Sequence, residues 1–194
     1  MNLYTKYPHV LTYKGDEYRT TAYFNRILEC VDILDRDDLS DADKVDVVFS
    51  LLFDERIRDP QKKSDLITAL FESFPSTDKD DSPPSISFAQ DAGLIRAGFL
   101  QAYGIRLDDQ FDVMTWPEFL DLLQGLPADT RMMEIAELRQ RPLPKPTKYN
   151  QEEIQALSSL KTKYAIRDKK NPEKALDGAL RRMFEQLKGW CNNA

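Results

Sequence analysis

The residues that most often carry out catalysis are scarce in this sequence. Among its 194 residues there are one histidine, His9, and two cysteines, Cys30 and Cys191. A Ser-His-Asp or Cys-His arrangement would need His9 beside a nucleophile, and its position after Pro8 and before a strand does not suggest one. Zinc would find no set of cysteines and histidines. The sequence therefore predicts no catalytic residue and no zinc site, and we interpret His9 as a surface residue.

Glycine-rich phosphate loops and calcium-binding loops are also absent from the sequence. The seven glycines are scattered, so the chain has no glycine-rich phosphate loop. Acidic stretches that start at Asp35 and Asp78 alternate as a calcium loop does, but an EF-hand needs an oxygen ligand at position 5 and glycine at position 6. The first stretch has Leu39 at position 5, and the second has Pro83 at position 6. We expect solvated turns at both places, with no metal and no cofactor.

Long apolar runs are absent as well. No run of about 18 apolar residues occurs, so no membrane span is predicted. The opening residues, Met-Asn-Leu-Tyr-Thr-Lys-Tyr-Pro, lack the apolar core of a signal peptide. These absences predict a protein of the cytoplasm of the cell that makes it. A disulfide between Cys30 and Cys191 is disfavoured there, and we interpret Cys30 as a half-buried helical residue and Cys191 as a free thiol.

Charge is unevenly distributed along the chain, whose formal net charge is −6. Residues 1–130 hold 13 basic and 25 acidic side chains, and residues 131–194 hold 14 basic and 8 acidic ones. The two parts therefore carry −12 and +6. Two interpretations remain open. Either the two parts face different partners, or they attract each other within one fold or between the copies of an oligomer.

The basic part also raises the question of nucleic-acid binding. Its basic side chains cluster around Tyr164, at Lys161, Lys163, Arg167, Lys169 and Lys170. Such a cluster would bind phosphates in a salt-dependent way. An isoelectric point of about 5.0 and the lack of a known base-reading motif argue against this function.

What the sequence does contain is a β-hairpin followed by amphipathic helices. Strand-favouring residues on either side of a Lys-Gly-Asp turn predict the hairpin over residues 9–21. Apolar residues then recur at helical spacing in about eight stretches, which begin near residues 22, 40, 60, 88, 115, 131, 150 and 172. The predicted fold class is mainly α: a compact helical domain with a small N-terminal β-hairpin and a C-terminal helical hairpin.

Proline-rich stretches divide this succession of helices. Residues 75–87 hold three prolines and three aspartates, which predicts a loop inside the domain. Alternating prolines predict a stiff, extended linker over residues 142–149, with a proline-rich ligand for another protein as the alternative. The expected organisation is therefore a helical domain over 1–141, this linker, and a basic helical pair over 150–194.

The last predicted helix has a strong apolar stripe that lies beyond the main domain. A stripe in this position suits a partner or self-association better than the domain's own core. The predicted partner-binding residues are Leu176, Leu180, Met183, Phe184, Leu187 and Trp190, together with Arg181 and Arg182.

The stretch over residues 97–144 organises the rest of the chain. Its pattern predicts a helix that stops at Gly104, a second helix that begins at Thr115 and stops at Gly125, and a third that ends before prolines. Thr115 is predicted to cap the second helix in a capping box with Glu118.

This stretch resembles a family of tail-assembly chaperones from long-tailed, siphovirus-type bacteriophages, which are encoded between the major tail protein and the tape-measure protein. The resemblance covers about residues 7–145. Its residues are Phe99, Tyr103, Gly104, Ile105, Leu107, Trp116, Phe119, Leu122, Gly125, Leu126, Pro127, Ile135, Arg139 and Pro142. We interpret the aromatic members as core residues, because a fold signature usually reflects packing.

The resemblance implies a protein that is not an enzyme and that works in the host bacterial cytoplasm during phage assembly. Its implied partners are the tape-measure protein, which it binds, and the major tail protein, whose tail-tube subunits it helps to recruit. It would self-associate and be absent from the mature particle. The alternatives are a non-enzymatic structural or regulatory adaptor of a phage, and an enzyme subunit whose catalytic residues are completed by a partner chain.

Overall fold

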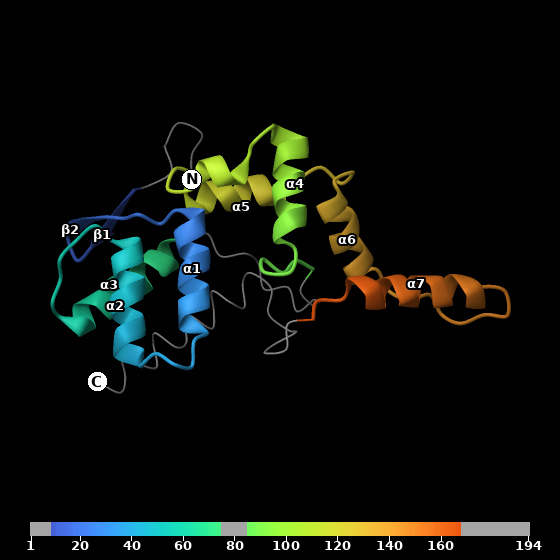
Figure 1. Ribbon diagram of the computed structural model, residues 1–194, viewed down its shortest axis with the longest axis horizontal. Coiled ribbons are helices and arrows are strands. Elements are labelled where there is room, and N and C mark those ends of the chain that lie inside the picture. Colours follow the sequence, from blue (N-terminus) through green and yellow to red (C-terminus); the bar gives the residue numbers. More distant parts are fainter. Residues whose placement is uncertain (1–8, 75–84, 168–194) are drawn as a thin grey trace. The chain divides into compact units, whose positions relative to one another are not determined.

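The computed structural model describes residues 9–74 and 85–167 (Figure 1). This part of the chain is mainly helical with a small antiparallel hairpin, which confirms the predicted mainly α fold class with its N-terminal β-hairpin. The second helix of the predicted C-terminal helical hairpin lies outside the described residues. Its elements are β1 (Val10–Tyr13), β2 (Asp16–Arg19), α1 (Phe24–Leu34), α2 (Asp41–Leu52), α3 (Pro60–Ser73), α4 (Ala92–Tyr103), the 3-10 helix η1 (Leu107–Gln110), α5 (Trp116–Gln124), α6 (Arg131–Gln140) and α7 (Gln151–Tyr164).

The described residues form two compact units. The first unit contains residues 9–74 and 108–124, and the second contains residues 85–107 and 125–167. The predicted domain boundary at residues 142–149 stays a prediction. No helix in the described part of the chain is both long and apolar enough to cross a membrane.

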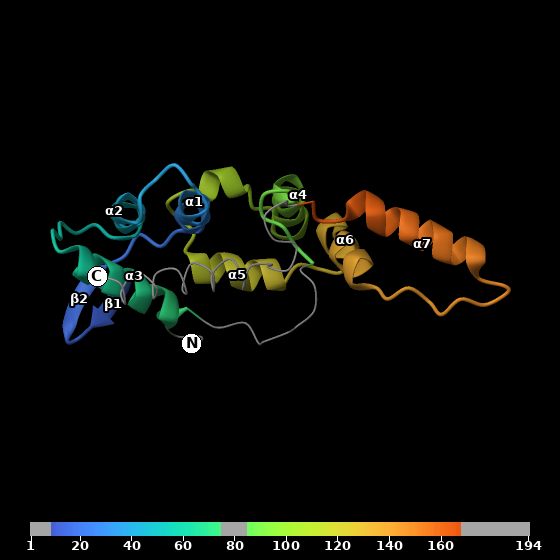
Figure 2. The same ribbon diagram turned by 90° about the horizontal axis from the view of Figure 1, so that it is seen from below.

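The predicted hairpin is confirmed at the start of the first unit. Its turn is made by Lys14 and Gly15, which both have positive φ, at 51° and 91°. Two such residues in a row match the right-handed twist of the strands that they connect. Leu11 and Tyr18 face each other in the register and are both buried. The hairpin lies beside α3, as Figure 2 shows.

Helices α1, α2 and α3 form the apolar core of the first unit. Their buried residues fall on one face of each helix, as the predicted stripes require, and include Ile27, Val48, Leu52, Leu66 and Ile67. Cys30 of α1 is also completely buried rather than half-buried, so that prediction is wrong. Its helical stripe is wider than the sequence suggested. Burial raises the pKa of the Cys30 thiol above its ordinary value.

The starts of α2 and α3 follow ordinary capping rules. The hydroxyl of Ser40 accepts a hydrogen bond from the backbone N–H of Asp43 at 3.2 Å. The carboxylate of Asp59 accepts one from the N–H of Gln61 at 3.0 Å, and Pro60 occupies the first turn of α3. The predicted helix starts near residues 40 and 60 are therefore confirmed.

The predicted capping box at the start of α5 is wrong. The hydroxyl of Thr115 is buried and has no hydrogen-bond partner in the described part of the chain. Instead, the backbone around Thr115 pairs with the backbone around Tyr23 in a short antiparallel bridge. The N–H of Trp116 donates to the carbonyl of Ala22 at 2.9 Å, so a backbone partner far away in the sequence replaces the local cap.

The second unit is built on α4, α6 and α7. Gly104 ends α4 in the left-handed conformation, with φ at 67°, and its N–H donates to the carbonyl of Leu100. The N–H of Ile105 donates to the carbonyl of Phe99, which completes the helix end that the sequence predicted. Helix α7 packs on α6 (Figure 1).

Candidate functional site

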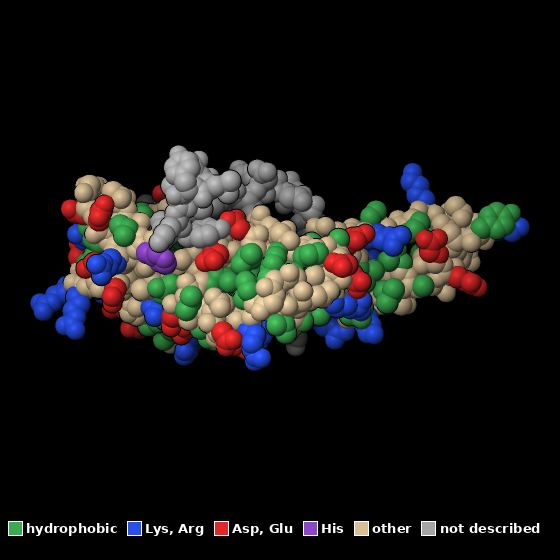
Figure 3. All heavy atoms as spheres, turned by 90° about the horizontal axis from the view of Figure 1, so that it is seen from above, with side chains coloured by type: hydrophobic (Ala, Val, Ile, Leu, Met, Phe, Trp, Pro, Cys, Tyr) green, Lys and Arg blue, Asp and Glu red, His purple; other side chains and the backbone are tan. Residues whose placement is uncertain are grey.

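The predicted partner-binding residues Leu176, Leu180, Arg181, Arg182, Met183, Phe184, Leu187 and Trp190 lie outside the described residues, so this site stays a prediction. His9 is exposed, as predicted, and is the purple side chain on the surface in Figure 3. Within residues 9–74 and 85–167, no group of three or more histidine, cysteine, aspartate or glutamate side chains is placed to hold a metal ion.

Three of the four aromatic residues that carry the family resemblance, Phe99, Trp116 and Phe119, are core residues, as interpreted from the sequence, whereas Tyr103 is only partly buried. In the first unit, Trp116 and Phe119 are buried with their rings stacked at 5.6 Å. Phe119 also stacks on Phe24 of α1 at 4.9 Å, which joins α5 to α1. In the second unit, Phe99 is buried and its ring meets that of Tyr103 edge-on at 5.8 Å. These residues therefore define the fold rather than a binding surface.

A close approach between α4 and α6 explains one of the small residues in the second unit. A Cβ atom on Gly98 would lie 3.3 Å from Cδ1 of Leu126 and 3.8 Å from Cβ of Met132. Leu126 belongs to the Gly-Leu-Pro turn of the resemblance and is buried. The side chain of Leu126 thus occupies the space that the missing side chain of Gly98 leaves.

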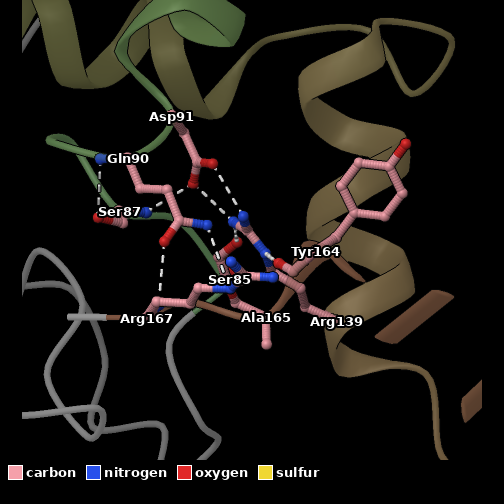
Figure 4. A network of polar contacts seen from close by, with 8 residues as sticks. All are labelled: Ser85, Ser87, Gln90, Asp91, Arg139, Tyr164, Ala165 and Arg167. Atoms are coloured by element: carbon pink, nitrogen blue, oxygen red, sulfur yellow. Dashed lines mark hydrogen bonds and ion pairs between the residues drawn. The ribbon is translucent and has the colours of Figure 1, made fainter. Parts of the chain in front are cut away.

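Arg139 differs from the other residues of the resemblance because it is polar and buried. Its guanidinium forms a bidentate ion pair with Asp91, with Nη1–Oδ2 and Nη2–Oδ1 distances of 2.6 and 2.8 Å (Figure 4). The two side chains are only 6% and 2% exposed. The same guanidinium donates from Nη1 to the carbonyl of Ser85 at 2.8 Å and from Nε to the carbonyl of Tyr164 at 2.7 Å. One side chain thus joins three segments of the second unit.

Asp91 is positioned by its own turn. The N–H of Ser87 donates to Oδ2 of Asp91 at 2.8 Å, and the N–H of Asp91 donates to the carbonyl of Ser87 at 2.8 Å. The N–H of Gln90 donates to Oγ of Ser87 at 3.2 Å. These bonds hold the Asp91 carboxylate where it contacts Arg139. We call the ion pair together with Ser85, Ser87, Gln90 and Tyr164 the arginine clasp.

Further polar contacts hold the segment around the end of α7. The side chain of Gln90 donates to the carbonyl of Ala165 at 3.0 Å and accepts from the N–H of Arg167 at 2.9 Å (Figure 4). The Nζ atom of Lys161 donates to the carbonyls of Arg139 and Arg141, at 2.8 and 2.5 Å. Lys161 therefore satisfies carbonyls at the C-terminal end of α6, where a positive charge is favoured.

The arginine clasp has a structural role in the second unit, because it joins the segment before α4 to α6 and to the end of α7. Its charged groups are matched by partners of the same unit, and their burial leaves little surface for a ligand. Arg139 is one of the residues of the family resemblance, whereas nothing in the sequence pointed to Asp91. A carboxylate that comes 48 positions earlier in the chain carries no local pattern that would name its partner.

Exposed apolar side chains are the remaining candidates for an interaction surface. In the first unit they are Val10, Phe111 and Val113, and in the second they are Leu100, Leu143, Tyr149 and Leu160. Figure 3 shows apolar side chains that reach the surface among acidic and basic ones. Apolar side chains scattered singly over a surface are ordinary, so these residues do not by themselves mark a binding surface.

Comparison with known proteins identifies a family. The model of the family described as Bacteriophage Gp15 protein matches residues 4–166. Neither a curated protein nor a solved structure matches the chain. The match covers the hairpin and every helix that the structure describes.

Proposed function

The chain belongs to the bacteriophage Gp15 protein family, and from this premise we propose that it is a tail-assembly chaperone. It would bind the tape-measure protein in the host cytoplasm, help to recruit tail-tube subunits of the major tail protein, and leave before the particle is complete. The observation that carries the proposal is the family match over residues 4–166, which spans the stretch of residues 7–145 that resembles tail-assembly chaperones.

Two properties of the chain fit this function. A chaperone for a long, apolar helix must bind reversibly, and exposed apolar side chains surrounded by charges allow this. A net charge of −6 also helps to keep an assembly soluble. In the proposed mechanism, several self-associated copies cover the apolar stripe of the tape-measure helix, and tube protein later displaces them.

Co-expression with the product of the next long gene downstream tests the proposal. We expect that product to be soluble only in the presence of this protein and to co-purify with several copies of it. A variant with Leu180→Ser and Phe184→Ser tests the predicted partner-binding stripe, and Glu185→Gln serves as a matched control off the stripe. A downstream product that is equally insoluble with and without this protein would contradict the chaperone function.

A second measurement separates the chaperone from an adaptor. Immunoblots of purified particles should show no trace of this protein, because a chaperone leaves before the particle is complete. Its persistence in the particles would instead identify a structural adaptor of the phage.

A further inference from the structure

Residues 108–113 comprise the end of η1 and the turn that follows it, and they carry two exposed apolar side chains on the first unit. We call this segment the 108–113 loop. Phe111 and Val113 are 46% and 61% exposed. The rings of Phe111 and Phe24 of α1 meet in an edge-to-face arrangement, with their centroids 5.7 Å apart, so Phe111 is anchored on α1 as well as exposed. Together these two side chains form a small apolar patch on the surface of the first unit.

The loop is held in a defined shape. Asp112 lies in the left-handed region, with φ at 56°. Nε of Arg26 donates to Oδ1 of Asp112 at 2.6 Å, and the N–H of Asp112 donates to Oδ1 of Asn25 at 3.1 Å. Helix α1 therefore fixes the residue between Phe111 and Val113. A loop that is already ordered loses little conformational entropy when a partner binds.

The chemistry of the loop indicates what would bind it. Its sequence, Asp-Asp-Gln-Phe-Asp-Val, places two adjacent acids, both exposed, shortly before Phe111, with only Gln110 in between. The complementary pattern, two adjacent bases next to apolar side chains, occurs at Arg181-Arg182-Met183-Phe184. The opposite charges would align the apolar parts of the two segments.

We propose that the 108–113 loop binds residues 176–190 of this protein, with Arg181 and Arg182 beside its aspartates and Phe184 against Phe111 and Val113. The described part of the chain ends at Arg167, whose N–H is fixed by Gln90, and residues 168–194 follow it. The contact would cover two apolar surfaces at once. This proposal goes beyond the proposed function, because it gives the predicted partner-binding stripe a binding site on this protein itself.

Chemical cross-linking of the full chain tests this contact. The variant Val113→Cys places a thiol on the loop, and the native Cys191 comes seven residues after Phe184 in the sequence, which would be about 10 Å along the helix that the sequence predicts there. A bismaleimide with a spacer of that length would join the two thiols, and Cys30 is too buried to compete. Val10→Cys is the matched control, because Val10 is 44% exposed on the same unit.

We expect the Val113→Cys variant to give a yield of the link to Cys191 about tenfold higher than Val10→Cys, because binding raises the effective concentration of the two thiols. Peptide mass spectrometry identifies the link, and adding Cys191→Ser should abolish it. Links within one chain and links between two copies both support the contact, and the mass of the product distinguishes them. Equal yields from the Val113→Cys and Val10→Cys variants would overturn the proposal.

Charge reversal provides a second test that does not alter the apolar residues. Arg181→Glu with Arg182→Glu should lower the yield severalfold, and adding Asp108→Lys with Asp109→Lys should restore it. Circular dichroism confirms that each variant is folded. If the cross-linking yield changes with neither set of substitutions, the proposed pairing of charges is overturned. The proposed chaperone function would be unaffected by that result.

Discussion

The two units hold their helices together in different ways. In the first unit, α2 and α3 pack through fully buried apolar side chains such as Val48, Leu66 and Ile67. In the second unit, α7 as described contributes a single buried apolar side chain, Leu157, and its end is joined to its neighbours by hydrogen bonds and the arginine clasp. Apolar burial has no preferred direction, whereas hydrogen bonds do. The first unit is therefore held mainly by apolar packing. In the second unit, α4 and α6 also pack through buried apolar side chains such as Phe99 and Met132, but α7 is attached mainly by directional polar contacts.

The largest expected effect comes from breaking the arginine clasp. Arg139→Met would leave the buried Asp91 carboxylate without its ion-pair partner, which should lower the free energy of unfolding by about 3–5 kcal/mol. Urea denaturation followed by circular dichroism measures this loss. Glu134→Gln is the control on the same helix, because Glu134 forms an exposed pair with Arg131 and its loss should cost only about 1 kcal/mol or less. Similar losses from both variants would show that the clasp is not important for stability.

The next largest loss of stability is expected from a cavity in the apolar core of the first unit. Leu66→Ala removes a fully buried side chain of α3 and should cost about 2–5 kcal/mol. Leu157→Ala on α7 should cost less, because α7 contributes little else to an apolar core. Differential scanning calorimetry of the two variants compares them directly. A larger effect at Leu157 would contradict the view that polar contacts hold α7.

A smaller effect, of opposite sign, is expected at the start of α5. Thr115→Val keeps the shape of the side chain and removes a buried hydroxyl that has no partner in the described residues, so it should stabilise the protein by about 1 kcal/mol. The capping box predicted from the sequence would give a loss of similar size instead. The sign of the change in melting temperature therefore decides between the two arrangements.

The smallest effect concerns the 108–113 loop and pH. The hydrogen bond from Arg26 holds the pKa of Asp112 below its ordinary value. The folded pKa thus lies below the unfolded pKa, so the stabilisation is present above the unfolded value of about 4 and is lost as the pH falls through the folded pKa. Asp112 is half exposed, so solvent and salt weaken the effect.

Asp112→Asn should remove this pH dependence while keeping a residue that tolerates positive φ. The difference in melting temperature between pH 7 and pH 3 should be slightly smaller in this variant than in the natural chain. Repeating the comparison in high salt should shrink the gap between the two proteins further. An unchanged pH profile would show that the Arg26–Asp112 pair does not contribute to stability.

Local patterns explain why most of the fold could be predicted from the sequence. The Lys14–Gly15 turn, the Ser40 cap and the Gly104 helix end each depend on residues within a few positions of each other. The apolar stripes of α1 to α3 likewise repeat at a spacing that the sequence displays. Such features need no knowledge of which elements meet in space.

The features that could not be predicted depend on contacts between distant residues. Thr115 loses its expected role because the backbone near Tyr23 pairs with it from about 90 positions away. Asp91 and Arg139 become partners only when α4 and α6 pack together. The predicted partner-binding stripe from Leu176 to Trp190 stays a prediction, because it lies outside the described residues.

The chain order of the first unit has a consequence for its synthesis on the ribosome. Phe24 of α1 stacks on Phe119 of α5, yet α5 is made only after α4, which belongs to the second unit. At about 5–20 residues per second, the ribosome needs roughly 3–10 s to add the 50 residues between 74 and 124. The nascent chain therefore carries the uncovered face of α1 for seconds, and the first unit can finish folding only when translation has passed Gln124.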